Sequence, residues 1–155
     1  MKISLKREEL LDLQVSLKKE YLITNGRGGF CSSTVLDCHT RKYHGLLNLP
    51  VIETGKVFNF LSKIELTASV NDMEFHLSTN KFPGVYNPTG HKYVDSFDYD
   101  FYPITTYTLG EAVIIKSILM PEGEDTVLVK YQLISGDQEI HFKANPLIAS
   151  RNIHS

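Results

Sequence analysis

Short runs of β-branched and aromatic residues, separated by tight turn signals, constrain the fold of this sequence more than any other feature. Two pairs of such runs are joined by very short connections. The pairs are Lys56–Val70 with Met73–Ser78 across Asn71-Asp72, and Thr105–Leu109 with Ala112–Met120 across Gly110-Glu111. Asn, Asp and Gly in a two-residue connection are typical of β-hairpins. Such runs recur about every 8–12 residues without helices between them, so we expect one all-β, antiparallel domain over residues 1–155, a sandwich or a barrel.

Other segments carry weaker signals. Further strands are predicted over Phe30–Val35, Tyr93–Tyr102, Thr126–Ile134 and Gln138–Lys143. Near the start, Arg7–Leu11 suggests a helical turn, and Leu11–Leu17 alternates apolar and polar residues with the period of a strand. Two stretches, Thr24–Gly29 and Asn80–His91, lack the pattern of tight turns and are expected to be longer loops.

The charge pattern excludes several classes of partner. The chain has 16 basic and 18 acidic residues, for a net charge of −2. Nucleic-acid binders carry a basic excess because they neutralise phosphates, so we expect no nucleic-acid partner. No apolar run is long enough to span a bilayer, and the start of the chain lacks the apolar core of a secretion signal. We therefore expect a cytoplasmic protein with no membrane partner.

The cysteines suggest neither a disulfide nor a metal site. Cys31 and Cys38 form no CxxC pair, and His39 and His44 are the nearest further ligands. A structural zinc site needs about four ligands, and cytosolic thiols stay reduced. We interpret both cysteines as small buried side chains and expect no metal and no cofactor.

Three glycines within four residues, Gly26, Gly28 and Gly29, raise the question of a phosphate-binding loop. Such a loop leads into a helix, whereas Phe30–Val35 has the pattern of a strand. The favoured interpretation is that these positions need a positive φ or leave room for a close neighbour, because glycine tolerates both.

The segment Thr40–Gly45 brings two cations, a phenol and an imidazole close together. As a strand it would direct Arg41 and Tyr43 to one side. Lys42 and His44 would then face the other side. The segment is either a polar surface for binding or domain contact, or a solvated strand edge with a buried histidine.

Catalysis by this chain alone finds little support in the sequence. A glycosidase needs two carboxyl groups that flank the scissile bond. The acidic candidates are Asp95, Asp98, Asp100, Glu122, Glu124 and Asp125. The first three alternate with aromatic residues, as on a half-solvated strand, and the last three belong to a turn. No serine or cysteine stands in the context of a nucleophile elbow.

The stretch Phe82–Pro88, followed by His91, is a better candidate for a ligand site. Aromatic rings can cover the flat faces of sugars, and Asn or His side chains can hydrogen-bond to sugar hydroxyls. The alternative is a structural loop whose rings fill the core.

Read in order, several segments resemble the N-terminal domain of the bacterial and archaeal glycogen debranching enzymes. The most specific are Glu20–Phe30 (EYLITNGRGGF) and Thr40–Leu47 (TRKYHGLL). Weaker similarity continues through Pro83–Val85, Pro88–Tyr93, Phe97, Met120-Pro121, Asn145–Leu147 and Arg151–His154. The similarity covers nearly the whole chain.

This resemblance implies a β-sandwich that precedes an (α/α)6 barrel, with the amylo-α-1,6-glucosidase carboxylates located in the barrel. A chain of 155 residues is too short to hold both domains. We therefore expect an N-terminal part of a longer enzyme, with the sandwich cut short at its C-terminal end and no activity on its own.

The resemblance also points to six residues for contact with substrate or with the barrel. The first choices are Asn25, Arg41, Tyr43 and His44, and His91 and Tyr93 follow them. The expected partners are the catalytic barrel of the same polypeptide and glycogen or another α-glucan, with no cofactor. Two other roles stay open: a structural or oligomerisation module, such as a homodimer, that binds no sugar, and an independent carbohydrate-binding module.

Overall fold

The computed structural model describes residues 2–155. The strands are β1 (Ile3–Lys6), β2 (Glu20–Thr24), β3 (Phe30–Thr34), β4 (Gly45–Val51), β5 (Lys56–Val70), β6 (Met73–His76), β7 (Thr79–Phe82), β8 (Val85–Thr89), β9 (Val94–Tyr99), β10 (Pro103–Leu109), β11 (Ala112–Leu119), β12 (Leu128–Ser135) and β13 (Ile140–Asn152). Short helices α1 (Arg7–Leu11) and α2 (Leu13–Ser16) follow β1, and single 3-10 turns form η1 (Ile52–Thr54) and η2 (Gly90–Tyr93).

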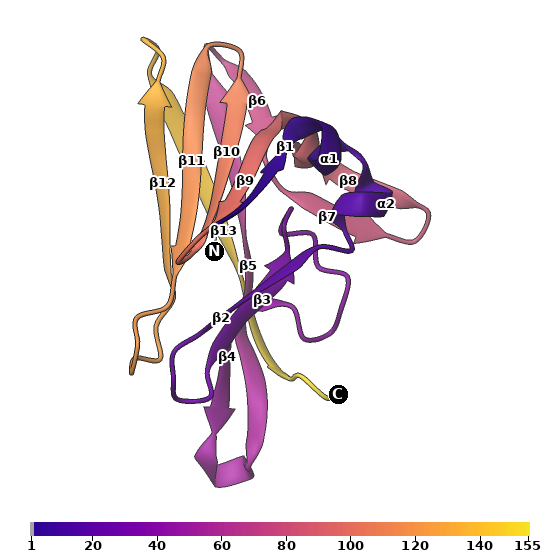
Figure 1. The fold of residues 1–155 in the computed structure, drawn as a ribbon, viewed down its shortest axis with the longest axis vertical. Coiled ribbons are helices and arrows are strands. Elements are labelled where there is room, and N and C mark those ends of the chain that lie inside the picture. Colours follow the sequence, from indigo (N-terminus) through magenta and orange to yellow (C-terminus); the bar gives the residue numbers. More distant parts are fainter. Residues whose placement is uncertain (1) are drawn as a thin grey trace.

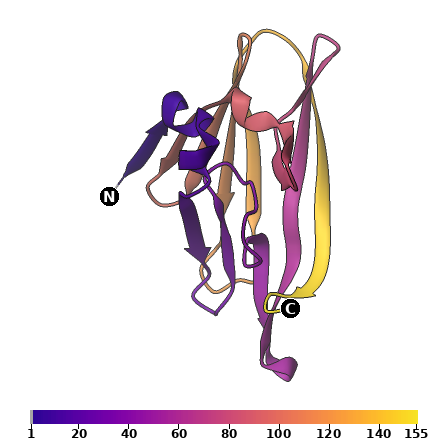
Figure 2. The same ribbon diagram turned by 90° about the vertical axis from the view of Figure 1, so that its right-hand side faces the viewer.

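Two antiparallel sheets pack face to face (Figures 1 and 2). The first sheet has the strand order β1-β9-β10-β11-β12, and the second has the order β13-β5-β4-β3-β2, with β6 also paired to β5. The β7–β8 hairpin forms a separate pair beside the sandwich (Figure 1). The all-β, antiparallel fold expected from the sequence is confirmed, and it is a sandwich.

The core lies between the sheets, because side chains alternate inward and outward along the paired strands. In β10 and β11 every second residue is buried. Aromatic pairs bridge the two sheets: the Tyr21 and Phe97 ring centroids lie 5.9 Å apart, and those of Tyr131 and Phe142 lie 6.3 Å apart. Burial of such apolar surface stabilises the sandwich by about 25 cal/mol per Å².

Both predicted hairpins are confirmed. Asn71 and Asp72 have φ values of 50° and 62°, and Gly110 has a φ of 62°. Turns with positive φ follow the right-handed twist of the two strands that they connect. Asn, Asp and Gly adopt this backbone region with the least strain, so the turn residues themselves set the register of each hairpin.

The first residues differ in part from the prediction. The helical turn at Arg7–Leu11 is confirmed, but the predicted strand over Leu11–Leu17 is wrong, because Leu13–Ser16 form a helix. The Asp12 carboxylate accepts a hydrogen bond from the backbone N–H of Gln14 at 2.9 Å and so caps that helix. A local cap thus outweighs a short alternating pattern.

Later strands exist where they were predicted, with different bounds. The strand expected over Tyr93–Tyr102 is confined to Val94–Tyr99. The strand predicted over Gln138–Lys143 runs instead from Ile140 to Asn152, because it pairs along most of the long β5. Within residues 2–155, no helix has the length and apolar character needed to cross a membrane.

Candidate functional site

Residues 35–44 connect β3 to β4 and end in a tight turn over residues 41–44, so the strand considered for Thr40–Gly45 begins only at Gly45. The backbone N–H of His44 donates to the Arg41 carbonyl at 3.1 Å, which closes the turn. The Nδ1 atom of His44 accepts from the backbone N–H of Thr40 at 3.0 Å. The His44 ring thus accepts the backbone hydrogen bond of Thr40 that a neighbouring strand would otherwise accept. His44 is buried as a result, whereas Arg41, Lys42 and Tyr43 all point outward.

Glu20, at the start of β2, joins both ends of this turn. Its Oε1 atom lies 2.7 Å from Arg41 Nε and 3.3 Å from His44 Nε2. Because Nδ1 of His44 is an acceptor, its Nε2 carries the proton in the neutral ring. Burial lowers the pKa of His44, Glu20 partly opposes this, and Arg41 lowers it further. The ring is therefore neutral at pH 7 and serves to fix the turn.

The end of β13 reaches the same turn from the far end of the sequence. Arg151 Nη2 donates to the Lys42 carbonyl at 2.7 Å, and Lys42 Nζ donates to the His154 carbonyl at 3.3 Å. The rings of Tyr43 and His154 meet edge to face with centroids 5.6 Å apart. We name Arg41, Lys42, Tyr43, Arg151 and His154 the turn surface. It offers four basic side chains and one half-exposed phenol.

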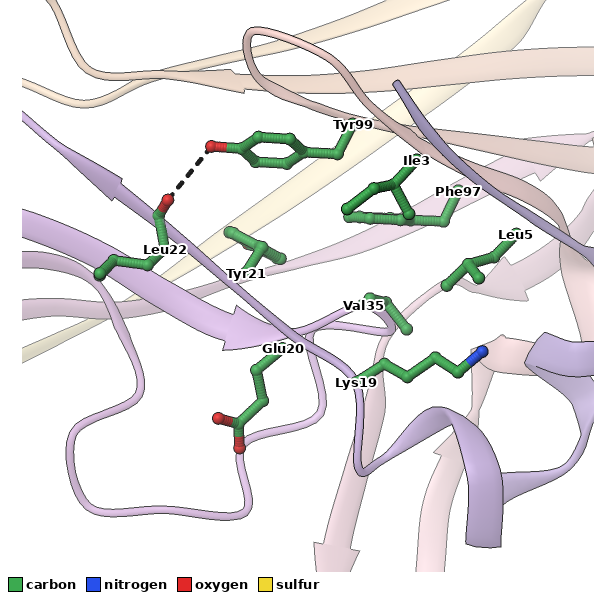
Figure 3. A pocket seen from close by; sticks show the side chains of 9 residues that line it. All are labelled: Ile3, Leu5, Lys19, Glu20, Tyr21, Leu22, Val35, Phe97 and Tyr99. Carbon is green, nitrogen blue, oxygen red and sulfur yellow. Dashed lines mark hydrogen bonds between the residues drawn. The ribbon is translucent and has the colours of Figure 1, made fainter. Parts of the chain in front are cut away.

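A cavity of about 480 Å³ opens between β1, β2 and β9, at one edge of the sandwich (Figure 3). It is lined by Ile3, Leu5, Lys19, Glu20, Tyr21, Leu22, Val35, Phe97 and Tyr99. The Tyr99 hydroxyl donates to the Leu22 carbonyl at 3.1 Å and so links the two sheets across the opening. Glu20 belongs both to this cavity and to the contacts of the turn surface.

The glycine-rich loop between β2 and β3 is organised around Asn25, which is fully buried. The Asn25 Oδ1 atom accepts from the backbone N–H groups of Arg27 and Gly29, each at 2.9 Å. Its Nδ2 atom donates to the Glu124 carbonyl at 2.9 Å and to Asp125 Oδ1 at 3.0 Å. The Asn25 amide is saturated by partners within the chain, so any effect on a ligand would pass through the loop that it holds.

The glycines of this loop show both features expected of them, a positive φ and a close neighbour. Gly26 and Gly28 have φ values of 74° and 87°, which a side chain would strain. A Cβ atom on Gly29 would lie 2.5 Å from Asn25 Nδ2. The loop leads into β3 and not into a helix, which removes the basis for a phosphate-binding loop.

The stretch Asn80–His91 is a hairpin and a 3-10 turn, so the expectation of an irregular loop is wrong. A Pro-Gly pair forms its turn, with Gly84 at a φ of 75°. Phe82 and Val85 flank this turn and are 51% and 53% exposed, which makes the hairpin tip an apolar contact surface. The loop rings therefore do not simply plug the core.

His91 and Tyr93 lie behind this hairpin and contribute little exposed surface. His91 is buried, and burial together with Lys92 lowers its pKa. Tyr93 packs edge to face on Phe75 with centroids 5.4 Å apart. The structure thus separates the six predicted residues: Arg41 and Tyr43 are exposed on one surface, and the other four are mainly internal.

Two of the acidic candidates, Asp98 and Asp100, line one surface pocket of about 280 Å³ with Lys2, Phe101, Tyr102 and Ile104. Asp98 accepts a hydrogen bond from the Ser4 hydroxyl, and Asp125 accepts one from the Asn25 side chain. Glu122 and Glu124 are exposed in the loop after β11. Within residues 2–155 no group of three or more His, Cys, Asp or Glu side chains is arranged to hold a metal ion. Both cysteines are free and buried.

Three residues around this turn were not predicted from the sequence: Arg151 and His154 of the turn surface, and Glu20, which is joined to the turn. Glu20, Arg151 and His154 lay inside segments quoted for the family resemblance, but nothing in their spacing placed them beside residues 40–44. Their proximity is a product of tertiary structure, since more than one hundred residues separate Lys42 from His154. Correlated substitutions between these two segments in related sequences would be the signal that reveals this contact.

An antiparallel β-sandwich does not by itself specify a function, because the same fold serves many. Comparison with known families specifies the family of this chain. The family described as "Glycogen debranching enzyme N terminal" matches residues 19–155. No curated protein and no solved structure matches the chain. The chain belongs to the family of glycogen debranching enzyme N-terminal domains.

Proposed function

We propose that this chain is a non-catalytic domain that supports hydrolysis of α-1,6-glucosidic bonds in glycogen or another α-glucan. It does so by shaping the substrate cleft and by packing on a catalytic barrel in the same polypeptide. The family match over residues 19–155 is the observation that carries the proposal. The acids that break the bond belong to the barrel.

The turn surface supports a contact with glucan. Tyr43 is 40% exposed and can cover the flat face of a sugar ring. Arg41 and Lys42 stand beside it as exposed hydrogen-bond donors for sugar hydroxyls. Because the turn is closed through His44 and Glu20, these groups are held in place before any ligand arrives.

Strand β13 supports a contact with another domain. Leu147 and Ile148 are 42% and 82% exposed, although each is a large apolar residue in a strand. Phe142, which stacks on Tyr131 between the sheets, is still 40% exposed. Exposed apolar surface gathered on one element marks an interaction site more often than an accident of folding. In this proposal the barrel covers that strand.

A second candidate is an oligomerisation module that binds no sugar. Strands β12 and β13 end their sheets within the described residues, and Leu133 and Ile134 on β12 are also exposed. Two copies could cover these strands mutually, because strand edges readily pair with other chains.

Titration of the chain with maltooligosaccharides separates the two. The proposal expects binding with a Kd of about 1 mM, weakened about fivefold or more by Tyr43→Ala. Tyr102→Ala is the matched control, because Tyr102 is similarly exposed at 36% and lies outside the turn surface. Absence of binding, together with concentration-dependent association in sedimentation, would favour the oligomerisation module.

A further inference from the structure

A charged pair lies between the two sheets and takes no part in the proposed contacts. The Asp37 carboxylate, just after β3, contacts the Lys116 ammonium on β11 of the opposite sheet, with 15% and 10% of their side chains exposed. The Tyr21 hydroxyl donates to Asp37 Oδ1 at 2.6 Å. Asp37 thus binds groups from both sheets at once.

The pair is charged at neutral pH. Burial would raise the pKa of Asp37, but Lys116 and then Tyr21 hold it below the ordinary value. Burial would lower the pKa of Lys116, and Asp37 reverses this, so that the pKa is raised.

Asp37 is also at a special backbone position. Its φ of 52° lies in the left-handed region, which a non-glycine residue rarely adopts without a local reason. On its N-terminal side, Thr34 Oγ1 accepts from the Cys38 N–H at 3.0 Å and donates to the Cys38 carbonyl at 2.9 Å. The chain therefore reverses at Asp37, and Arg41 follows four residues later. The position of Asp37 therefore fixes where the backbone that leads to Arg41 begins.

A second lysine beside this pair holds the other exposed segment. Lys63 Nζ, on β5, donates to the Thr79 carbonyl at 2.8 Å and to Asn80 Oδ1, at the start of the β7–β8 hairpin. Burial lowers the pKa of Lys63 to about 8, and Asp37 is the largest influence that opposes it. Lys63 thus holds the base of the hairpin, beside the Asp37–Lys116 pair, whose aspartate lies four residues before Arg41.

Stability alone is a weak explanation for such a pair. Replacing a buried ion pair with apolar residues of similar volume is often neutral or stabilising. The pair instead restricts geometry: a carboxylate that accepts from two fixed donors has few alternative orientations, so the Asp37 side chain is held in one position.

We infer that Asp37 and Lys116 form a positioning pair, which holds the turn surface in its binding geometry by anchoring it to the opposite sheet. This inference rests on the proposed function for its consequence in binding. Its structural part, the placement of residues 40–44, can be measured without any ligand.

The first test is native-state trypsin digestion of the double variant D37N/K116M. Both charges are removed, while Asn tolerates the positive φ of this position and keeps an acceptor for the Tyr21 hydroxyl, so the thermal midpoint is expected to stay close to that of the parent protein. Cleavage after Arg41 and Lys42 is expected to become about tenfold faster, because the turn opens without its anchor. Cleavage after Lys56, which is exposed at the β4–β5 tip, is the internal control and stays unchanged. Unchanged cleavage at Arg41 and Lys42 overturns the inference.

A milder variant covers the case in which the double variant does not fold. Tyr21→Phe removes one of the two donors to Asp37 and leaves the ring in the core. Amide hydrogen exchange at Thr40 and Arg41 is expected to become faster than in the parent protein. Equal protection in the two proteins overturns the inference.

Maltooligosaccharide titration of the same double variant connects the pair to binding. The expected result is a loss of affinity as large as that of Tyr43→Ala. If the parent protein binds glucan, and the double variant has an open turn but the same affinity, the inference is overturned. If the turn opens and the parent protein binds no glucan, the positioning of the turn is supported and the proposed function falls.

Discussion

The turn surface and strand β13 are both exposed, yet they are held in different ways. Arg41 and Tyr43 stand on a turn that is closed by His44 and joined to Glu20. Strand β13 pairs with β5 alone and presents large apolar side chains to solvent along its length. In the proposed function, the first arrangement holds polar groups ready for a sugar ligand, and the second presents apolar surface that another domain covers.

The largest expected effect comes from breaking the anchor on one side. Lys116→Met leaves the Asp37 carboxylate buried without its counter-charge, which is expected to lower the free energy of unfolding by about 3–5 kcal/mol. Lys130→Met, on the neighbouring β12, removes an exposed ammonium and is expected to change it by less than about 0.5 kcal/mol. Urea denaturation measures both, and equal values for the two variants would contradict the account.

The next effect concerns the residue that ends the turn. A Cβ atom on Gly45 would overlap Asn59 Nδ2 and lie 2.9 Å from Asn48 Oδ1, and these two side chains are hydrogen-bonded to each other in the interior. Gly45→Ala is therefore expected to lower the free energy of unfolding by about 2–4 kcal/mol.

Gly110→Ala is the matched control for Gly45→Ala. A Cβ atom at Gly110 would meet nothing within 4 Å, and only its positive φ penalises a side chain. The expected loss is about 1–2 kcal/mol, measured by the same denaturation experiment. A larger loss for Gly110→Ala than for Gly45→Ala would count against the packing around the turn.

A further prediction concerns the free energy of unfolding at acidic pH and the part that His39 plays in it. Burial, and then Lys63, lowers the pKa of His39 to about 3. Between about pH 6.5 and pH 3 the unfolded chain therefore binds a proton at His39 that the folded protein does not bind, so stability falls as the pH falls. His39→Leu is expected to reduce this slope by up to about 1.4 kcal/mol per pH unit. A full slope in the variant, in denaturation series from pH 7 to pH 4, would show that another group is responsible.

The smallest expected effect on stability belongs to β13. Ile148 is 82% exposed, so Ile148→Ser is expected to change the free energy of unfolding by less than about 0.5 kcal/mol. Under the proposed function, the same change is expected to weaken contact with the proposed catalytic barrel, measured as affinity between the chain and that barrel expressed separately. A destabilisation of about 2 kcal/mol or more would mean that the side chain already has its partner within this domain.

The fold was largely predictable from the sequence because its signals are local. The hairpins at Asn71-Asp72 and at Gly110-Glu111 were correct since turn residues specify both the conformation and the register. The errors were also local in origin. The capping role of Asp12 and the Pro-Gly turn at Gly84 were overlooked, and a helix and a hairpin took the places of a strand and a loop.

The candidate site was less predictable, because burial and long-range contacts decide which polar residues remain available. Arg41 and Tyr43 are exposed, but Asn25, His44 and His91 hold other parts of the chain or lie in its interior. The Asp37–Lys116 pair joins residues 79 positions apart, and no spacing rule relates them. The roles of all six predicted residues in binding stay predictions.

The most direct test of the central claim is release of glucose from a branched α-limit dextrin by this chain alone and by the chain joined to its barrel. The account predicts no release by the chain alone, and release by the joined protein that falls with Tyr43→Ala and persists with Tyr102→Ala. Glucose released by the chain alone, or equal activity of the two joined variants, would contradict it.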